Sequence, residues 1–193
     1  MAIAIPLIIV AALSRVFALN HPELLNFSPM MALAFCGAIY LKRPYNYAIP
    51  LAALLASDLY LNHHYGVSLF YVGMIFKYLS FGLAFLIGVW VSRNKTWTSI
   101  FGGAFAGSVL FYLITNSYAW VVEPGYAKSL AGWWQALTVG LPGFAPTWTF
   151  FRHSLTSDLL FVASLSFIME WMALREGGAS LFGRRSRENL AES

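Results

Sequence analysis

Five ionisable side chains interrupt otherwise apolar stretches of this 193-residue sequence, and they are the residues best placed to do chemistry. They are Arg15, Asp58, Lys77, Asp158 and Glu170. A charge in the hydrocarbon of a membrane costs roughly 3 kcal/mol on insertion scales and above about 10 kcal/mol in simulations. Such groups therefore face a polar interior or a partner of opposite charge. The pattern predicts a membrane protein with a polar pocket.

An ion pair inside the membrane is the first chemistry that these residues allow. Arg15 beside Asp58 or Asp158 could clamp the carboxylate or phosphate of a substrate, because a guanidinium group offers two parallel donors. The same pair could instead join two helices without touching a substrate, and the sequence leaves both interpretations open. Lys77 would complete a nearly neutral network of two cations and two carboxylates.

Histidines and paired carboxylates raise other chemistries. His63 and His64 follow Asp58 closely, and imidazole binds Zn, Cu, Co and Ni, but the spacing matches no familiar metal site. Axial ligation of a pigment or haem by one histidine is a weaker alternative. Asp58 and Asp158 could serve as the acid–base pair of an intramembrane hydrolase, yet their flanking residues do not resemble aspartyl membrane proteases. We therefore expect no catalysis, and no cofactor beyond those metal and pigment alternatives.

Composition sets the class of protein. The chain is 59% hydrophobic and 10% charged, whereas soluble domains carry about 25% charged residues. Long continuous apolar runs favour membrane helices over a transmembrane barrel, which needs short alternating strands. The net charge of +4 is typical of membrane-protein loops, so we expect a lipid bilayer and no nucleic acid as partner. With Cys36 as its single cysteine, the sequence has no disulfide framework.

Six apolar segments are expected to form one transmembrane domain over residues 1–174. They cover about residues 3–19, 29–42, 45–61, 67–91, 97–121 and 154–174. The first is interpreted as a retained helix and not a signal peptide, because no basic region precedes it. Gly, Pro and Trp interrupt residues 122–153, which we expect to be interfacial or re-entrant. Residues 175–193 are expected to form a basic, polar cytoplasmic tail.

Loop charges orient these segments. With six spans and a cytoplasmic N-terminus, eight of the twelve Lys and Arg residues lie in cytoplasmic loops or the tail. Both termini are therefore expected in the cytoplasm. This topology places Arg15, Asp58 and Asp158 toward the outer side, Lys77 near mid-depth and Glu170 near the inner face. An outward-opening polar cavity is the simplest prediction.

Two neutral residues in the outer part of segment 97–121 complete the expected site. Asn116 and Trp120 lie at the same predicted level as the outer charges. The predicted substrate-binding residues are Arg15, Asp58, Lys77, Asn116, Trp120 and Asp158. Glu170 lies toward the opposite face and is left out of the site.

Small residues recur at helical spacing in three segments. Gly103 and Gly107 are four residues apart, as are Ala34 and Ala38, and Ala48, Ala52 and Ala56 repeat on one helix face. Such positions let helix backbones approach each other closely in membranes. Packing within the bundle is the ordinary interpretation, and a docking face for a partner subunit is the alternative.

Four stretches resemble an uncharacterised family of small bacterial membrane proteins described as putative transport proteins. They are Ala12-Leu13-Ser14-Arg15 … Asn26-Phe27-Ser28-Pro29, Ala48-Ile49-Pro50-Leu51-Ala52 … Ser57-Asp58-Leu59, Gly107-Ser108-Val109-Leu110-Phe111 … Thr115-Asn116 … Trp120, and Ser157-Asp158-Leu159-Leu160. The resemblance covers about residues 8–165. That family is similar to the substrate-binding subunits of energy-coupling-factor vitamin transporters.

The resemblance implies a six-helix protein of the bacterial inner membrane, with both termini inside and a ligand site near the outer face. It also implies a small-molecule ligand and partner subunits in the membrane. Those subunits often carry an alanine docking face on their first helix, whereas here the alanines lie in segment 45–61. Two functions are expected: a substrate-binding subunit for small-molecule uptake or, as the alternative, a non-catalytic accessory subunit of a photosynthetic or respiratory complex.

Overall fold

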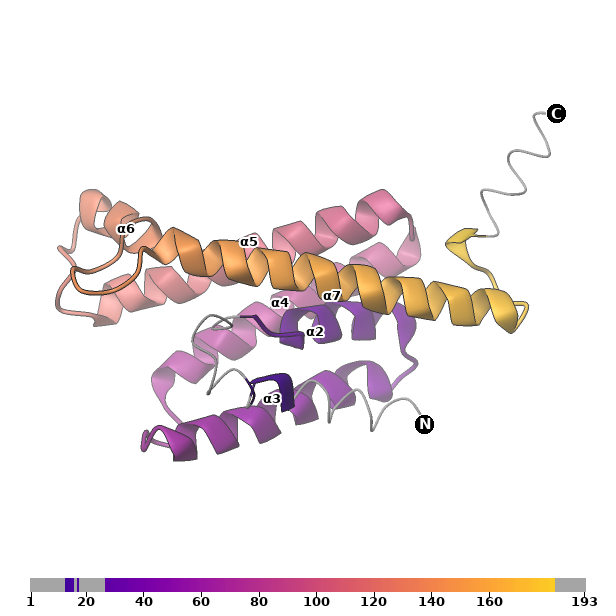
Figure 1. The fold of residues 1–193 in the computed structure, drawn as a ribbon, viewed down its shortest axis with the longest axis horizontal. Helices are drawn as coiled ribbons and strands as arrows, with labels where there is room; N and C mark the ends of the chain where they lie inside the picture. Colours follow the sequence, from indigo (N-terminus) through magenta and orange to yellow (C-terminus); the bar gives the residue numbers. More distant parts are fainter. Residues whose placement is uncertain (1–12, 16, 18–26, 183–193) are drawn as a thin grey trace.

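The computed structural model describes residues 13–15, 17 and 27–182, and these residues form helices and turns. The helices are α2 (Met30–Tyr40), α3 (Tyr45–His64), α4 (Val72–Arg93), α5 (Trp97–Val122), α6 (Leu130–Leu137) and α7 (Thr147–Arg175). The four long helices run back and forth along the long axis, with α6 at one end (Figure 1). The predicted all-helical class is thereby confirmed for the described part of the chain.

Helix α2 is the centre of the bundle. Nine of its eleven residues are buried, and it packs against α3, α4, α5 and α7. A helix that is apolar on every side lies in a protein core or in a membrane, and here the surrounding helices enclose it. Eleven residues extend only about 16 Å, roughly half the thickness of the hydrocarbon core. The short segment predicted at 29–42 is therefore an enclosed helix.

Helices α4, α5 and α7 are long and apolar enough to cross a membrane. They contain 22, 26 and 29 residues, so they extend about 33 to 44 Å. Within the described residues, these are the three helices that meet both the length and the composition of a span. The structure thus supports a helical membrane protein, while the count of six spans stays a prediction.

The predicted glycine pair of α5 packs inside the bundle. A Cβ atom on Gly103 would lie 2.9 Å from the ring of Phe35, and one on Gly107 would lie 3.5 Å from Ala84. Gly88 of α4 is equally constrained, because its Cβ would meet the backbone oxygen of Phe35 at 2.5 Å. These glycines let α2, α4 and α5 approach closely, which confirms the packing interpretation for Gly103 and Gly107.

Helix α3 is held mainly by α2. It has little backbone contact with α4, although the two are consecutive in the chain. Pro50 lacks an amide proton and leaves the Asn46 carbonyl without its helical donor. That carbonyl faces Gly37 of α2, where a Cβ would lie 3.0 Å from it. On another side of α3, the alanine stripe of Ala48, Ala52 and Ala56 is exposed.

The two ends of the bundle differ in charge. The α2–α3 turn, the α4–α5 turn and the end of α7 lie at the same end (Figure 1). That end carries Lys42, Arg43, Arg93, Lys95 and Arg175. We call it the basic end, and the opposite end holds the α3–α4 turn and α6.

The segment before the last helix is a short helix flanked by turns. Helix α6 has eight residues, so it extends about 12 Å and is too short to cross a membrane. Helix α7 begins at Thr147, seven residues before the predicted start at 154. The prediction was wrong there because the mixed aromatic and polar run after Pro146 lacks the continuous apolar character used to place that start.

Candidate functional site

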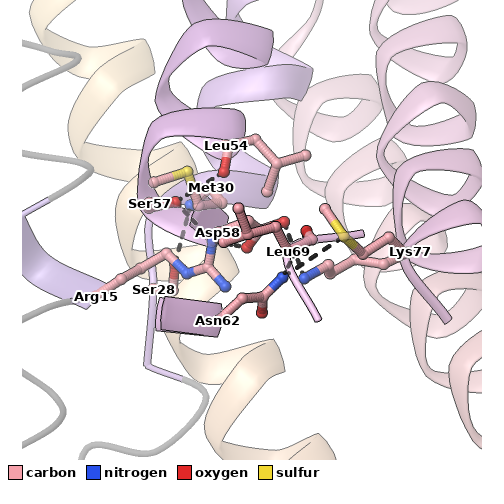
Figure 2. Close-up of polar contacts among 10 residues, drawn as sticks. Arg15, Ser28, Met30, Leu54, Ser57, Asp58, Asn62, Leu69 and Lys77 are labelled. Carbon is pink, nitrogen blue, oxygen red and sulfur yellow. Dashed lines mark hydrogen bonds and ion pairs between the residues drawn. The ribbon is translucent and has the colours of Figure 1, made fainter. Parts of the chain in front are cut away.

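Asp58 is the centre of a charged cluster between α3 and α4 (Figure 2). Its Oδ1 accepts a hydrogen bond from Nη1 of Arg15 at 2.6 Å, and its Oδ2 lies 2.9 Å from Nζ of Lys77. The Asp58 side chain is 1% exposed, against 17% for Arg15 and 19% for Lys77. We call Arg15, Asp58 and Lys77 the charged cluster. Its three formal charges sum to +1.

Polar residues of α3 beside Asp58 hold Arg15 and the following turn in place. Ser57 donates to the carbonyl of Leu54 at 3.0 Å and accepts from Arg15 at 2.7 Å. One turn after Asp58, Nδ2 of Asn62 donates to the carbonyl of Leu69 at 3.1 Å. Asp58 and Asn62 are four residues apart and share a helix face. Ser57 therefore fixes Arg15, and Asn62 fixes the turn that leads into α4.

An apolar cavity of about 200 Å³ adjoins the charged cluster. Residues of α2, α3 and α4 line it, and they include Met30, Leu51, Leu54, Tyr78, Gly82 and Phe85. Leu54 lies one helical turn from Asp58, and Tyr78 directly follows Lys77. The Tyr78 hydroxyl is buried and interacts with the Asp58 carboxylate. No charged residue lines the cavity itself, so Tyr78 connects the apolar cavity to the charged cluster.

Asp158 forms a second buried polar contact. It is 5% exposed and accepts a hydrogen bond from Ser108 of α5 at 2.6 Å. Its neighbour Ser157 accepts from the Ser28 amide at 2.8 Å and donates to the Ser28 carbonyl at 3.1 Å. These contacts join α7 to α5 and to the chain before α2. Of the two pairings predicted for Arg15, the structure contains the one with Asp58.

The other two predicted site residues bond to nearby backbone. Nδ2 of Asn116 donates to the Tyr112 carbonyl at 2.8 Å. Nε1 of Trp120 donates to the Ala127 carbonyl at 2.8 Å, and Lys128 donates to the carbonyl of Trp120. The Asn116 contact lies within α5, whereas the two contacts of Trp120 stabilise the end of α5 and the turn after it. Of the six predicted residues, the structure brings Arg15, Asp58 and Lys77 into direct contact.

The rim of the α3–α4 turn is aromatic. His64 stacks on Tyr60 at a centroid distance of 6.4 Å and meets the edge of Tyr65 at 5.4 Å. His63 is exposed, and the described residues hold no group of three His, Cys, Asp or Glu able to bind a metal. Tyr71 precedes α4; burial, with a smaller contribution from Asp58, raises the pKa of Tyr71.

Glu170 is the buried carboxylate of the basic end. Its side chain is 0% exposed, and Oε1 lies 2.5 Å from Nζ of Lys95. Oε2 accepts from the amide of Leu181 at 2.7 Å, and Ser180 donates to the Glu170 carbonyl at 2.9 Å. Glu170 therefore fastens the chain after α7 and the α4–α5 turn to α7.

Several partners of the predicted residues carry little signal in the sequence. Ser57 directly precedes Asp58, so its role could have been found by proximity. Ser108 and Asp158 are 50 residues apart, and Lys95 lies in a turn far from Glu170 in sequence. No periodicity connects such positions, because their contact depends on how the helices pack.

The fold and the charged cluster define a helical membrane protein with buried ion pairs at two levels. The chain belongs to the Family of unknown function (DUF6580), whose family model matches residues 1–179. No curated protein and no solved structure matched the chain.

Proposed function

We propose that this protein is a solute-binding subunit for small-molecule uptake in the bacterial cytoplasmic membrane. The observation that supports it best is the sharing of one buried carboxylate, Asp58, by Arg15 and Lys77. An anionic group of a solute can take one of these cations while Asp58 keeps the other. The protein binds the solute and performs no chemistry on it.

The separation of α3 and α4 supports binding over a purely structural role. A structural ion pair is expected where two helices already pack tightly, because close packing excludes water and fixes the geometry. Here Asp58 and Lys77 connect helices with little backbone contact, and a cavity lies beside them. Opening this contact therefore disturbs few other interactions.

The level of the cluster supports access from the outer side. Asp58 lies six residues before the end of α3, and Lys77 lies five residues after the start of α4. Both are thus about 8 to 9 Å from the helix ends that lie opposite the basic end. Basic loops stay in the cytoplasm. This orientation, with six membrane-inserted helices and cytoplasmic termini, belongs to the proposal.

The exposed alanine stripe of α3 supports association with membrane partners. Ala48, Ala52 and Ala56 are all exposed, and small residues at this spacing let another helix approach closely. A coupling subunit that energises uptake is the partner we expect there. Association with a photosynthetic or respiratory complex is the competing outcome.

Native purification tests the proposed function. The full chain is isolated gently, and bound small molecules and proteins are identified by mass spectrometry. Wild type is compared with Lys77→Met, which removes a cation that the solute would contact, and with Lys95→Met, which neutralises the other lysine paired to a buried carboxylate. We expect a small molecule that accompanies wild type and Lys95→Met but is lost from Lys77→Met. A stoichiometric electron-transfer complex, with no small molecule dependent on Lys77, would overturn the proposal.

A further inference from the structure

The cavity beside the charged cluster has a definite chemical gradient. At one end, Leu54 and Tyr78 adjoin Asp58 and Lys77. From there the lining continues to Tyr47 on α3 and Phe85 on α4, seven residues farther in each case and so about 10 Å away. The lining over this distance is uncharged, and the charged cluster lies beyond the end marked by Leu54 and Tyr78. A ligand that occupies the cavity and also reaches the charged cluster must have an apolar end and a charged end.

The apolar part has room for a ring or a short hydrocarbon chain. Its volume is about 200 Å³, and an apolar cavity of about 150 Å³ can hold benzene. Its inner wall contains Met30 and Leu54, which are buried in one hydrophobic cluster, with Tyr78 and Phe81 packed against it. An apolar cavity of this kind stays dry and favours apolar atoms.

The cavity opens toward the side of α4 that faces lipid. Ile75, Leu79 and Leu86 form an exposed apolar stripe on α4, and Gly82 is exposed within the same stripe. A Cβ on Gly82 would meet no atom within 4 Å. On the opposite wall, Leu51 of α3 is also exposed. The gap between Gly82 and Leu51 therefore lets a hydrocarbon chain enter from the bilayer.

The charge at the other end selects the sign of the head group. Within the described part of the chain, Arg15 and Lys77 share one carboxylate, so these three side chains carry a formal charge of +1. Charge in a membrane interior is stabilised by an opposite charge. An anionic head beside Lys77 supplies that charge, and the buried Tyr78 hydroxyl beside Asp58 is a hydrogen-bond donor at the same end of the cavity.

We infer that the cavity between α3 and α4 binds an anionic amphiphile, whose head contacts Lys77 and Arg15 and whose hydrocarbon part lies against Leu54 and Phe85. The inference rests on the proposed function, because it names the ligand class of the same charged cluster. The amphiphile is either a free molecule or an anionic phospholipid of the bilayer, since both present this chemistry.

Direct binding tests the inference with decanoate as probe. The full chain is placed in phosphatidylcholine nanodiscs, and saturable binding of radiolabelled decanoate is measured after subtracting empty nanodiscs. Gly82→Leu places a side chain in the opening, and Gly102→Leu is its matched control, because a Cβ on Gly102 of α5 also meets nothing within 4 Å. We expect Gly82→Leu to weaken binding about tenfold or more and Gly102→Leu to leave it within about twofold.

Competition separates the contributions of head and tail. Neutral decanol is expected to compete about tenfold more weakly than decanoate, because it lacks the charge-assisted contact. Equal competition by decanol, or equal binding to the two leucine variants, would overturn the inference. A different result is that acetate competes as strongly as decanoate, with a competition that Gly82→Leu does not change. That result would overturn the inference of an amphiphilic ligand and leave the proposed solute site intact. Weaker decanoate binding when the protein is placed in nanodiscs that contain phosphatidylglycerol would identify a phospholipid of the bilayer as the natural ligand.

Discussion

Asp58 on α3 and Lys77 on α4 form a 2.9 Å ion pair across two helices that otherwise have little backbone contact. Asp58 also accepts a hydrogen bond from Arg15 at 2.6 Å, so one buried carboxylate joins three segments of the chain. Breaking a buried pair by removing one partner is costly, because the other charge stays buried without compensation. The charged cluster is therefore both a link between helices and a position where a ligand can compete.

Replacing Asp58 by asparagine should destabilise the protein more than replacing Lys77 by methionine. Asp58→Asn leaves two cations without a carboxylate, whereas Lys77→Met leaves Asp58 paired to Arg15. We expect a loss of about 3–5 kcal/mol for Asp58→Asn, measured by chemical unfolding in detergent micelles. The double variant should be less destabilised than the sum of the single variants by about 1 kcal/mol or more. Strict additivity would show that the two residues are not coupled.

Neutralising Glu170 should release the chain that follows α7. Glu170→Gln removes the charge that holds Lys95 and weakens the acceptor for the Leu181 amide. Limited proteolysis should then cut near residues 176–182 faster than in wild type. Exposed Glu176 lies six residues away, so Glu176→Gln is a suitable control. Equal cleavage rates in the two variants would contradict the role of Glu170 in docking this segment.

Two adjacent glycines of α5 should respond differently to the same substitution. Gly103→Leu forces a side chain into the ring of Phe35, which lies 2.9 Å from the Cβ position, while Gly102 faces open space. Overpacking of this kind costs about 1–3 kcal/mol, so Gly103→Leu should lower the melting temperature measured by circular dichroism. Gly102→Leu should leave the melting temperature nearly unchanged. A similar loss in both would indicate that α5 does not pack as described.

A larger residue in the alanine stripe of α3 should weaken association with a partner subunit. Ala52 is exposed between Ala48 and Ala56, so Ala52→Leu should leave the fold intact while it prevents close approach of another helix. Quantitative mass spectrometry after gentle purification should show less partner protein bound to Ala52→Leu than to wild type. Gly102→Leu, on an exposed part of α5, should retain the partner. Unchanged association with Ala52→Leu would show that this stripe faces lipid alone.

Much of the fold could be predicted because it depends on local composition. The segments predicted at 67–91 and 97–121 correspond to α4 and α5, since a membrane span requires a long apolar run that is visible in the sequence. The helix over 30–40 was also found, but not its place at the centre of the bundle. The first turns of α7 were missed, because residues 147–153 mix aromatic and polar side chains.

The candidate site was predictable residue by residue, but its grouping was not. A charged residue within an apolar run is visible in the sequence, so Arg15, Asp58 and Lys77 were all predicted. Arg15 had two possible carboxylate partners in the sequence. Only the packing of the helices pairs Arg15 with Asp58 and places Asp158 where it accepts a hydrogen bond from Ser108. Asn116 and Trp120 were predicted at the same level as the outer charges, whereas their side chains bond to neighbouring backbone.

By itself, the sequence determined that this chain is a helical membrane protein with charges inside, because hydrophobicity and loop charge are properties of short segments of the chain. The tertiary structure decided which charges meet, since ion pairing depends on distances of a few ångströms between helices far apart in sequence. It also decided that α3 and α4 have little backbone contact apart from the ion pair of Asp58 and Lys77. A cavity is the space that several packed elements leave between them, so no single segment encodes it.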